Sequence, residues 1–106
     1  MEEVDQVKEL ARLYKALGDE TRLRLLKLLS EQGSEGALCV GALAMCVGVS
    51  QPAVSQHLAV LRAAGLVIDE RRGYFVHYRL NRPGLKRWSE QVRGVLGEDL
   101  GGAVGG

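Results

Sequence analysis

One short stretch, Val47–Gly65, constrains the fold most because it combines the signals for a turn and a helix. Ser50 is a favourable N-cap, since its hydroxyl can accept a hydrogen bond from a backbone N–H of the first helical turn. Pro52 falls in that first turn, where its missing N–H costs nothing, and Gly65 stands where the helix should stop. Apolar residues at helical spacing predict one buried stripe: Val54, Leu58 and Leu61.

A second predicted helix precedes this one, and the two together have the pattern of a helix-turn-helix. Small and apolar residues over about Val40–Val47 end at Gly48, which gives a helix, a tight turn and a helix. Polar residues outside the buried stripe of the second helix have hydrogen-bonding groups suited to base edges in a major groove. They are Gln51, Ser55, Gln56 and Arg62. An ordinary αα-hairpin with a polar outer face is the alternative interpretation.

Basic side chains are concentrated in the same part of the chain. The 106 residues have a formal net charge of only +1, whereas residues 36–89 carry seven Lys and Arg and two acidic residues. The flanking segments 1–35 and 90–106 are each net negative. A surface that binds the phosphate backbone of DNA needs such a local excess of positive charge. A merely solvated surface gives no reason for the excess to coincide with the helix-turn-helix.

The length predicts one domain over residues 1–97, followed by a Gly-rich tail over 98–106 that we expect to be disordered. No run of about eighteen apolar residues is present, so the sequence predicts no membrane span. The acidic N-terminus differs from a secretory signal, and two cysteines are too few for a disulfide framework. We therefore expect a cytoplasmic protein with no membrane partner.

The remaining segments predict a mainly α-helical protein with a small β-hairpin. Helical periodicity marks residues 2–17, and Asp19 is a candidate N-cap for a Leu-rich helix that should lie centrally in the core. Residues 37–39 are a candidate short strand. Residues 66–72 and 74–80 alternate with period two and predict two strands joined around Gly73.

The end of the hairpin and the start of the last helix complete the expected order α-α-α-α-β-β-α. Asn81 is a candidate cap for the last helix, and Pro83 falls in its first turn. Arg71, Arg72 and Tyr74 lie at the hairpin tip. A basic tip of this kind is typical of a wing that contacts phosphates or a minor groove.

Three motifs in order resemble the ArsR/SmtB family of bacterial repressors. They are Leu17–Leu26, Ser50–Leu58 with its continuation to Val67, and Arg71–Gly73 followed by Tyr78–Leu80. The resemblance covers nearly the whole chain. It implies a winged helix-turn-helix that binds a near-palindromic operator in double-stranded DNA as a homodimer. It also implies a transcriptional repressor that an effector releases from DNA.

The resemblance also implies roles for single residues. The first and last helices form the dimer interface in this family, which assigns that role to apolar residues of the two terminal helices: Leu10, Leu13, Tyr14, Trp88, Val92 and Val95. Packing of Trp88 within one protomer is the alternative. On the DNA side we expect Gln51 and Ser55 at phosphates or base edges and Gln56 at a base edge. The expected backbone contacts are Arg62, Arg71, Arg72 and Tyr74.

Cys39 is the candidate effector or metal residue. It matches the first cysteine of the family's Leu-Cys-Val-Cys motif for arsenic and cadmium, but Gly41 replaces the second cysteine. Cys46 lies seven residues further on, which is about 10.5 Å along a helix and too far for a shared site within one chain. A thiophilic metal or metalloid and a thiol oxidant are candidate signals, and inert cysteines are the alternative. The fold itself requires no cofactor.

The two histidines argue against the His-rich zinc or nickel sites of this family. Neither His57 nor His77 lies on the last helix, where those sites have their ligands. We expect His57 to be a half-buried packing residue rather than a ligand.

Two other classes of function compete with DNA binding. In a winged-helix module for protein–protein contact, the outer face of Val47–Gly65 would meet another protein; the basic centre of the chain disfavours this. For an enzyme, the chain has no Gly-rich phosphate loop, no Cys–His pair at a plausible spacing and no acid pair in a core stretch. The sequence therefore predicts a DNA-binding regulator without catalytic residues.

Overall fold

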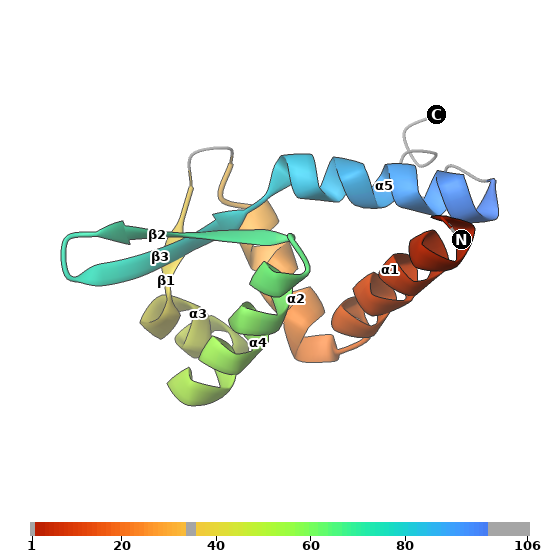
Figure 1. The fold of residues 1–106 in the computed structure, drawn as a ribbon. Helices are drawn as coiled ribbons and strands as arrows, with labels where there is room; N and C mark the ends of the chain where they lie inside the picture. Colours follow the sequence, from red (N-terminus) through yellow and green to blue (C-terminus); the bar gives the residue numbers. More distant parts are fainter. Residues whose placement is uncertain (1, 34–35, 98–106) are drawn as a thin grey trace.

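The computed structural model describes residues 2–33 and 36–97, which contain five helices and three strands (Figure 1). Their bounds are α1 Glu2–Leu17, α2 Glu20–Ser30, β1 Leu38–Cys39, α3 Val40–Val47, α4 Gln51–Ala63, β2 Val67–Arg72, β3 Phe75–Leu80 and α5 Arg82–Leu96. The element order confirms the prediction of a mainly helical fold with a β-hairpin. The predicted tail over 98–106 lies outside the described residues.

Side-chain caps begin three of the helices at the predicted residues. The carboxylate of Asp19 accepts a hydrogen bond from the backbone N–H of Arg22 at 3.1 Å at the start of α2. Ser50 caps α4 in the same way, with its Oγ 3.3 Å from the nitrogen of Ala53. The helix ends before Gly65, whose φ of +79° favours glycine.

Asn81 ties the start of α5 to the end of α4. Its Oδ1 accepts a hydrogen bond from the N–H of Gly84, and its Nδ2 donates to the carbonyl oxygen of Gly65 at 2.8 Å. A Cβ at position 84 would collide with that same carbonyl. The close approach of the two backbones therefore requires glycine at position 84, and it fixes the direction in which α5 leaves the hairpin.

The core lies between α2, α4 and the sheet. Leu25 and Leu29 of α2 and Leu58 of α4 are fully buried, and Leu66 closes the core at the start of the hairpin. The expectation that the Leu-rich helix is central is confirmed for most of its leucines. Leu23 is the exception, since 51% of it is exposed to solvent.

The sheet has three antiparallel strands in the order β1-β3-β2. The register of β2 and β3 runs from Val67 opposite Leu80 to Arg72 opposite Phe75, which leaves a two-residue loop of Gly73 and Tyr74. Positive φ at the first loop residue, Gly73, suits a tight hairpin turn. The short strand β1 pairs with β3 as a third strand, so the wing ribbon is supported on one edge.

Helices α1 and α5 pack side by side and extend away from the sheet and the α3–α4 pair (Figure 1). Within this packing, half of the residues predicted for the dimer interface are already buried. Leu10, Leu13 and Val92 are buried within one protomer, so they offer no surface to a partner in this arrangement. Trp88 is half-buried, packs against the core and lies edge-on to the ring of Tyr14, with ring centroids 6.2 Å apart. Trp88 therefore packs at least partly within its own protomer, which is the alternative role considered for it.

No helix within residues 2–33 and 36–97 is long and apolar enough to cross a membrane.

Candidate nucleic-acid interface

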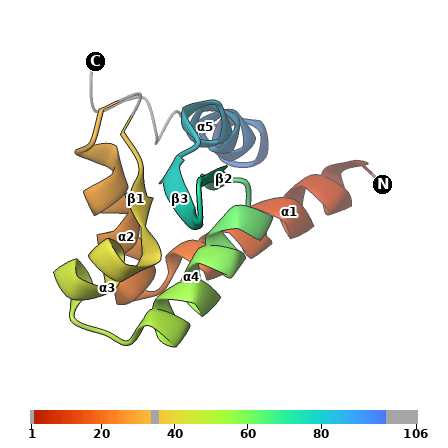
Figure 2. The same ribbon diagram turned by 90° about the vertical axis from the view of Figure 1, so that its left-hand side faces the viewer.

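Helix α4 has one buried side and one exposed polar side. Val54, Leu58 and Leu61 are completely buried against the rest of the domain, whereas Ser55 and Gln56 are exposed. Gly48 at the end of α3 has a φ of +73° and makes the tight turn between the two helices. Figure 2 shows α3 and the first turns of α4 at the bottom of the view, on the side of the molecule opposite α5. The predicted helix-turn-helix is confirmed, and its outward polar groups are available to a ligand.

Gln51 occupies a different place from the one that its sequence position suggests. Its side chain lies beside the backbone of α3, so that a Cβ at Gly41 would be 3.5 Å from its Nε2. The residue is exposed, but its amide is turned toward α3. A Cβ at this distance is in ordinary van der Waals contact, so the Gln51 amide lies against the start of α3 at Gly41, the position of the second cysteine in the family motif. Ser55 and Gln56 are therefore the principal outward polar side chains in the first half of α4.

The tip of the wing carries two exposed aromatic residues beside exposed arginines. Tyr74 is 94% exposed and Phe75 is 66% exposed. Arg71 is exposed, and no carboxylate in the described part of the chain pairs with it. Sequence reasoning missed Phe75, because strand alternation placed it on one face of the hairpin without showing that this face is uncovered at the tip. Tyr74 and Phe75 are adjacent in the chain, so together they give the tip of the wing a small exposed aromatic patch beside its arginines.

Two of the arginines expected at phosphates are held by the only acidic residues of the hairpin. Arg62 of α4 donates to Asp69 of β2 at 3.0 Å, and Arg72 donates to Glu70 at 2.7 Å. Arg79 also lies 3.7 Å from Glu70. All these pairs are partly open to solvent, where an ion pair contributes about 0–1 kcal/mol. A phosphate can therefore replace either carboxylate at little cost.

A polar cluster fixes the inner side of α4 to the start of α2. The Nε of Arg22 donates to Nδ1 of His57 at 3.1 Å, and its Nη1 donates to the carbonyl oxygen of Ala16 at 3.2 Å. The hydrogen bond from the backbone N–H of Arg22, aided by the nearby charge of the Arg22 guanidinium, holds the pKa of the Asp19 carboxyl below its usual value of 3.8. His57 is half-buried, as predicted, and it packs rather than reaching toward the outer face of α4.

The two cysteines lie at opposite ends of α3. Cys39 is the N-cap residue, and its side chain makes no capping hydrogen bond. It is half-buried, whereas Cys46 is exposed, and both thiols are free. Within residues 2–33 and 36–97, no three His, Cys, Asp or Glu side chains are grouped so that they could hold a metal ion. Cys39 therefore has no thiol partner within its own chain.

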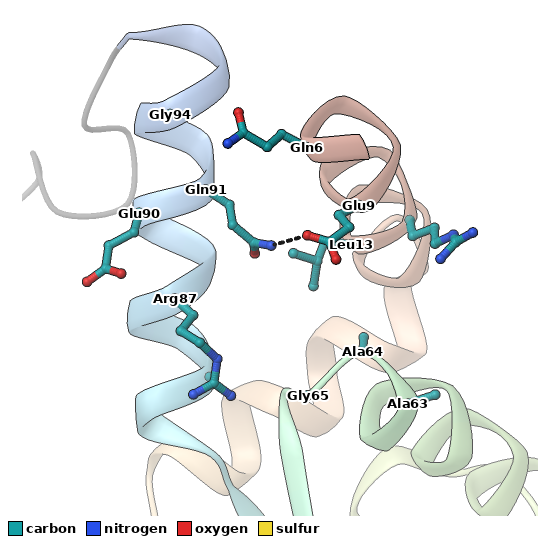
Figure 3. A pocket seen from close by; sticks show the side chains of 12 residues that line it. Gln6, Glu9, Leu13, Ala63, Ala64, Gly65, Arg87, Glu90, Gln91 and Gly94 are labelled. Atoms are coloured by element: carbon teal, nitrogen blue, oxygen red, sulfur yellow. Dashed lines mark hydrogen bonds between the residues drawn. The ribbon is translucent and has the colours of Figure 1, made fainter. Parts of the chain in front are cut away.

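A groove of about 490 Å³ lies between α1, α5 and the end of α4 (Figure 3). Gln91 of α5 donates across it to the carboxylate of Glu9 at 3.3 Å. Gln6 and Arg87 also line the groove. Its walls therefore carry a negative charge at Glu9 and a positive charge at Arg87. The groove belongs to the α1–α5 end of the molecule, and sequence reasoning missed it because it depends on the angle between two helices distant in the chain.

Comparison with known proteins gives consistent matches in sequence and in structure. The family profile described as "Bacterial regulatory protein, arsR family" matches residues 19–69, from the cap of α2 into β2. The arsenical resistance operon repressor of Escherichia coli (strain K12) is 46% identical over 80 residues, which are 76% of this chain and 65% of that protein.

Two solved structures have the same fold. An ArsR-like transcriptional regulator from Rhodococcus sp. RHA1 has a TM-score of 0.72 at 30% identity, covering 86% of this chain and 82% of that one. The homodimeric winged helix-turn-helix DNA-binding domain from Mycobacterium bovis has a TM-score of 0.70 at 31% identity. The match covers 92% of this chain and 86% of that one. The chain spans slightly less than two thirds of the E. coli relative but most of both solved chains. The fold is a winged helix-turn-helix, and the chain belongs to the ArsR family of bacterial regulatory proteins.

Proposed function

We propose that this protein is a transcriptional repressor that binds a near-palindromic operator in double-stranded DNA as a homodimer. The observation that carries the proposal is the two-sided character of α4. Its inner side is completely buried and hydrogen-bonded to α2 through His57, while Ser55 and Gln56 are exposed on its outer side. A rigid helix with outward amide and hydroxyl groups suits the major groove.

Gln56 is the proposed base-reading residue. A glutamine amide can donate to N7 and accept from N6 of adenine at once, and such a bidentate pair contributes about 1–3 kcal/mol of discrimination against a wrong base. Ser55 lies beside it and can bind a base edge or a phosphate. Gln51 can reach the DNA only after its side chain leaves Gly41.

The wing supplies the proposed backbone contacts. Arg71 has an uncommitted guanidinium, and Tyr74 can lie along the sugar–phosphate chain. Arg62 and Arg72 exchange their exposed carboxylate partners for phosphates when DNA binds. This surface is supported by the positive net charge of residues 36–89.

The proposed dimer uses the exposed parts of α1 and α5. Tyr14 is 42% exposed, and Val7 and Leu96 are each more than half exposed, while Val95 is half-buried. Leu10, Leu13 and Val92, which the sequence also assigned to this interface, lie buried beneath them. The homodimeric state of the M. bovis relative supports the same assembly here. Two copies of α4 would then face successive major grooves about 34–36 Å apart.

The proposed signal is a thiophilic metal, a metalloid or a thiol oxidant acting at Cys39. The E. coli relative is an arsenical resistance operon repressor, which supports a thiophilic signal. The two free cysteines fit an activity in the cytoplasm, where thiols are kept reduced.

Selection of binding sites from a random DNA pool tests this function. The purified reduced protein should enrich a near-palindrome whose half-sites are one helical turn apart, and sedimentation should show a dimer. A pool with no enriched sequence would contradict the proposal and favour a winged-helix module that contacts another protein. Gln56→Ala should lose the enrichment at one position of each half-site.

A further inference from the structure

Strand β1 brings a thiol and an imidazole together on one face of the sheet. Cys39 on β1 pairs directly with His77 on β3. Directly opposed residues of an antiparallel pair have side chains on the same face, with Cβ atoms about 5 Å apart. The adjacent pair, Leu38 and Tyr78, packs against the core, so Cys39 and His77 share the opposite face. Both are half-buried.

The ring of His77 has a polar atom without a partner. Its Nδ1 is buried and makes no hydrogen bond within the part of the chain that the structure describes. An unpaired buried nitrogen costs free energy, and a ligand that binds there is one physical explanation for it. The ring nitrogen with the free lone pair is also the atom through which a neutral histidine binds metals.

Cys39, His77 and Glu70 lie side by side across the three strands, and Glu70 is already paired with arginines. Glu70 on β2 is the other direct neighbour of His77. Its carboxylate accepts a hydrogen bond from Arg72 at 2.7 Å and lies 3.7 Å from the Nε of Arg79. Two arginines thus hold Glu70, and the thiol of Cys39 and the imidazole of His77 are the donors that this row offers to a ligand.

We propose that Cys39 and His77 form a binding site for a soft monovalent cation of the copper(I) class. Thiolate and imidazole are both ligands that copper accepts, and a two-coordinate ion needs two protein donors. If the bonds are close to those of zinc, about 2.3 Å to sulfur and 2.0 Å to nitrogen, a nearly linear ion places the two donor atoms about 4 Å apart, which Cβ atoms at about 5 Å permit. The thiol proton passes to solvent on binding, because the thiolate is the metal ligand.

The site joins two parts of the proposed DNA surface. Cys39 is the residue at which α3 begins, and α3 leads through Gly48 into α4. His77 lies on the strand that forms the wing. An ion held by both residues fixes the start of α3 to the wing strand and changes how freely α4 and the wing adjust to DNA. This consequence rests on the proposed function, whereas binding of the ion does not.

Competition for copper(I) tests the site directly. The reduced full-length protein is titrated anaerobically against a colorimetric copper(I) chelator, as wild type and as Cys39→Ser, His77→Asn and Cys46→Ser. Cys46→Ser is the matched control because it removes an exposed thiol from the same helix. Wild type and Cys46→Ser should each take one ion per protomer. Cys39→Ser and His77→Asn should bind more weakly by more than about tenfold, since losing a ligand costs at least as much as losing an outer-shell partner.

A second readout separates ligation from a structural role of His77. Copper(I) should shift the ring nitrogen resonances of His77 in the wild-type protein while those of His57 stay in place. His77→Gln replaces His77→Asn if circular dichroism shows that the latter is unfolded. Wild-type affinity in the His77 variants, an equal loss in Cys46→Ser, or no copper binding by the wild type would each overturn the site.

DNA binding of the same metal-free variants separates the two proposals. Sequence-specific DNA binding by a protein that takes no copper(I) overturns the site and leaves the repressor standing. Copper(I) binding that depends on both residues, in a protein without sequence-specific DNA binding, supports the site and contradicts the repressor.

Discussion

Arg22 and His57, which are 35 residues apart, are joined by a hydrogen bond of 3.1 Å from Nε of the arginine to Nδ1 of the histidine. The bond links α2 to the middle of α4, directly behind the exposed Ser55 and Gln56. The nitrogen that accepts it must be unprotonated, so His57 carries its proton on Nε2 in this arrangement. The inner side of α4 is therefore fixed by polar contacts as well as by apolar packing.

Arg22→Met should destabilise the domain by about 1–2 kcal/mol, because it removes a hydrogen bond from a charged donor to a half-buried acceptor. Urea denaturation of the variant and the wild type measures the difference. Arg24→Met is the matched control, since Arg24 lies on the same helix in an exposed pair with Glu20 and should cost less than about 1 kcal/mol. Equal losses in the two variants would contradict the role given to Arg22.

Asp19 should make part of the stability of α2 dependent on pH. Its pKa in the folded protein is below 3.8, chiefly because it accepts the backbone hydrogen bond of Arg22. Its charged form therefore contributes stability above the unfolded pKa, and this contribution is lost as the pH falls through the lowered pKa. Asp19→Asn keeps a capping side chain without the charge, so in thermal melts the advantage of the wild type should shrink as the pH falls below 3.8. An advantage that grows on acidification would contradict this prediction.

Gln56→Ala should relax specificity at one base pair of each half-site and leave non-specific binding unchanged. The expected loss of discrimination there is about 1–3 kcal/mol, because a bidentate contact to a base is removed. Competition assays with operators substituted one base pair at a time measure it. Uniform weakening across all sequences would show that Gln56 contacts the backbone instead.

Arg72 and Glu70 should have opposite effects on DNA affinity. Arg72→Ala removes a phosphate contact, so binding should weaken for all sequences and the slope of log affinity against log salt should fall by about one. Glu70→Gln frees Arg72 and Arg79 from their carboxylate, so it should tighten binding at low salt. Arg24→Ala, which breaks an exposed pair on α2, is the control. A change of sequence preference alone in Arg72→Ala would contradict the wing assignment.

The local parts of the fold follow from the sequence because short-range physics decides them. Ser50 and Asp19 cap their helices through their own side chains, Gly48 and Gly65 supply the positive φ that the turns need, and the alternation around Gly73 marks the hairpin. None of these features depends on a residue distant in the chain. Helix α4 and the wing could therefore be placed from the sequence.

The features that the sequence did not predict depend on contacts between segments that are distant in the chain. The apolar stripe containing Leu10 and Val92 has the same pattern whether it packs on the protomer's own helix or on a partner, so the sequence could not distinguish the two. The ion pair of Arg62 with Asp69 follows from the packing of α4 beside β2, and the pairing of Cys39 with His77 follows from the strand register. Only the folded sheet shows that the chain has a Cys–His pair, which its sequence spacing conceals.

The most direct test of the central claim is DNA binding of the purified reduced protein, measured by fluorescence anisotropy over a range of salt concentrations. The probes are DNA from upstream of its own gene and a shuffled sequence of the same composition. We expect the protein to bind the upstream DNA about 10³-fold more tightly, or better, than the shuffled DNA, with a steep loss of affinity as salt rises. Equal affinity for both DNAs at every salt concentration would contradict the claim that α4 reads sequence.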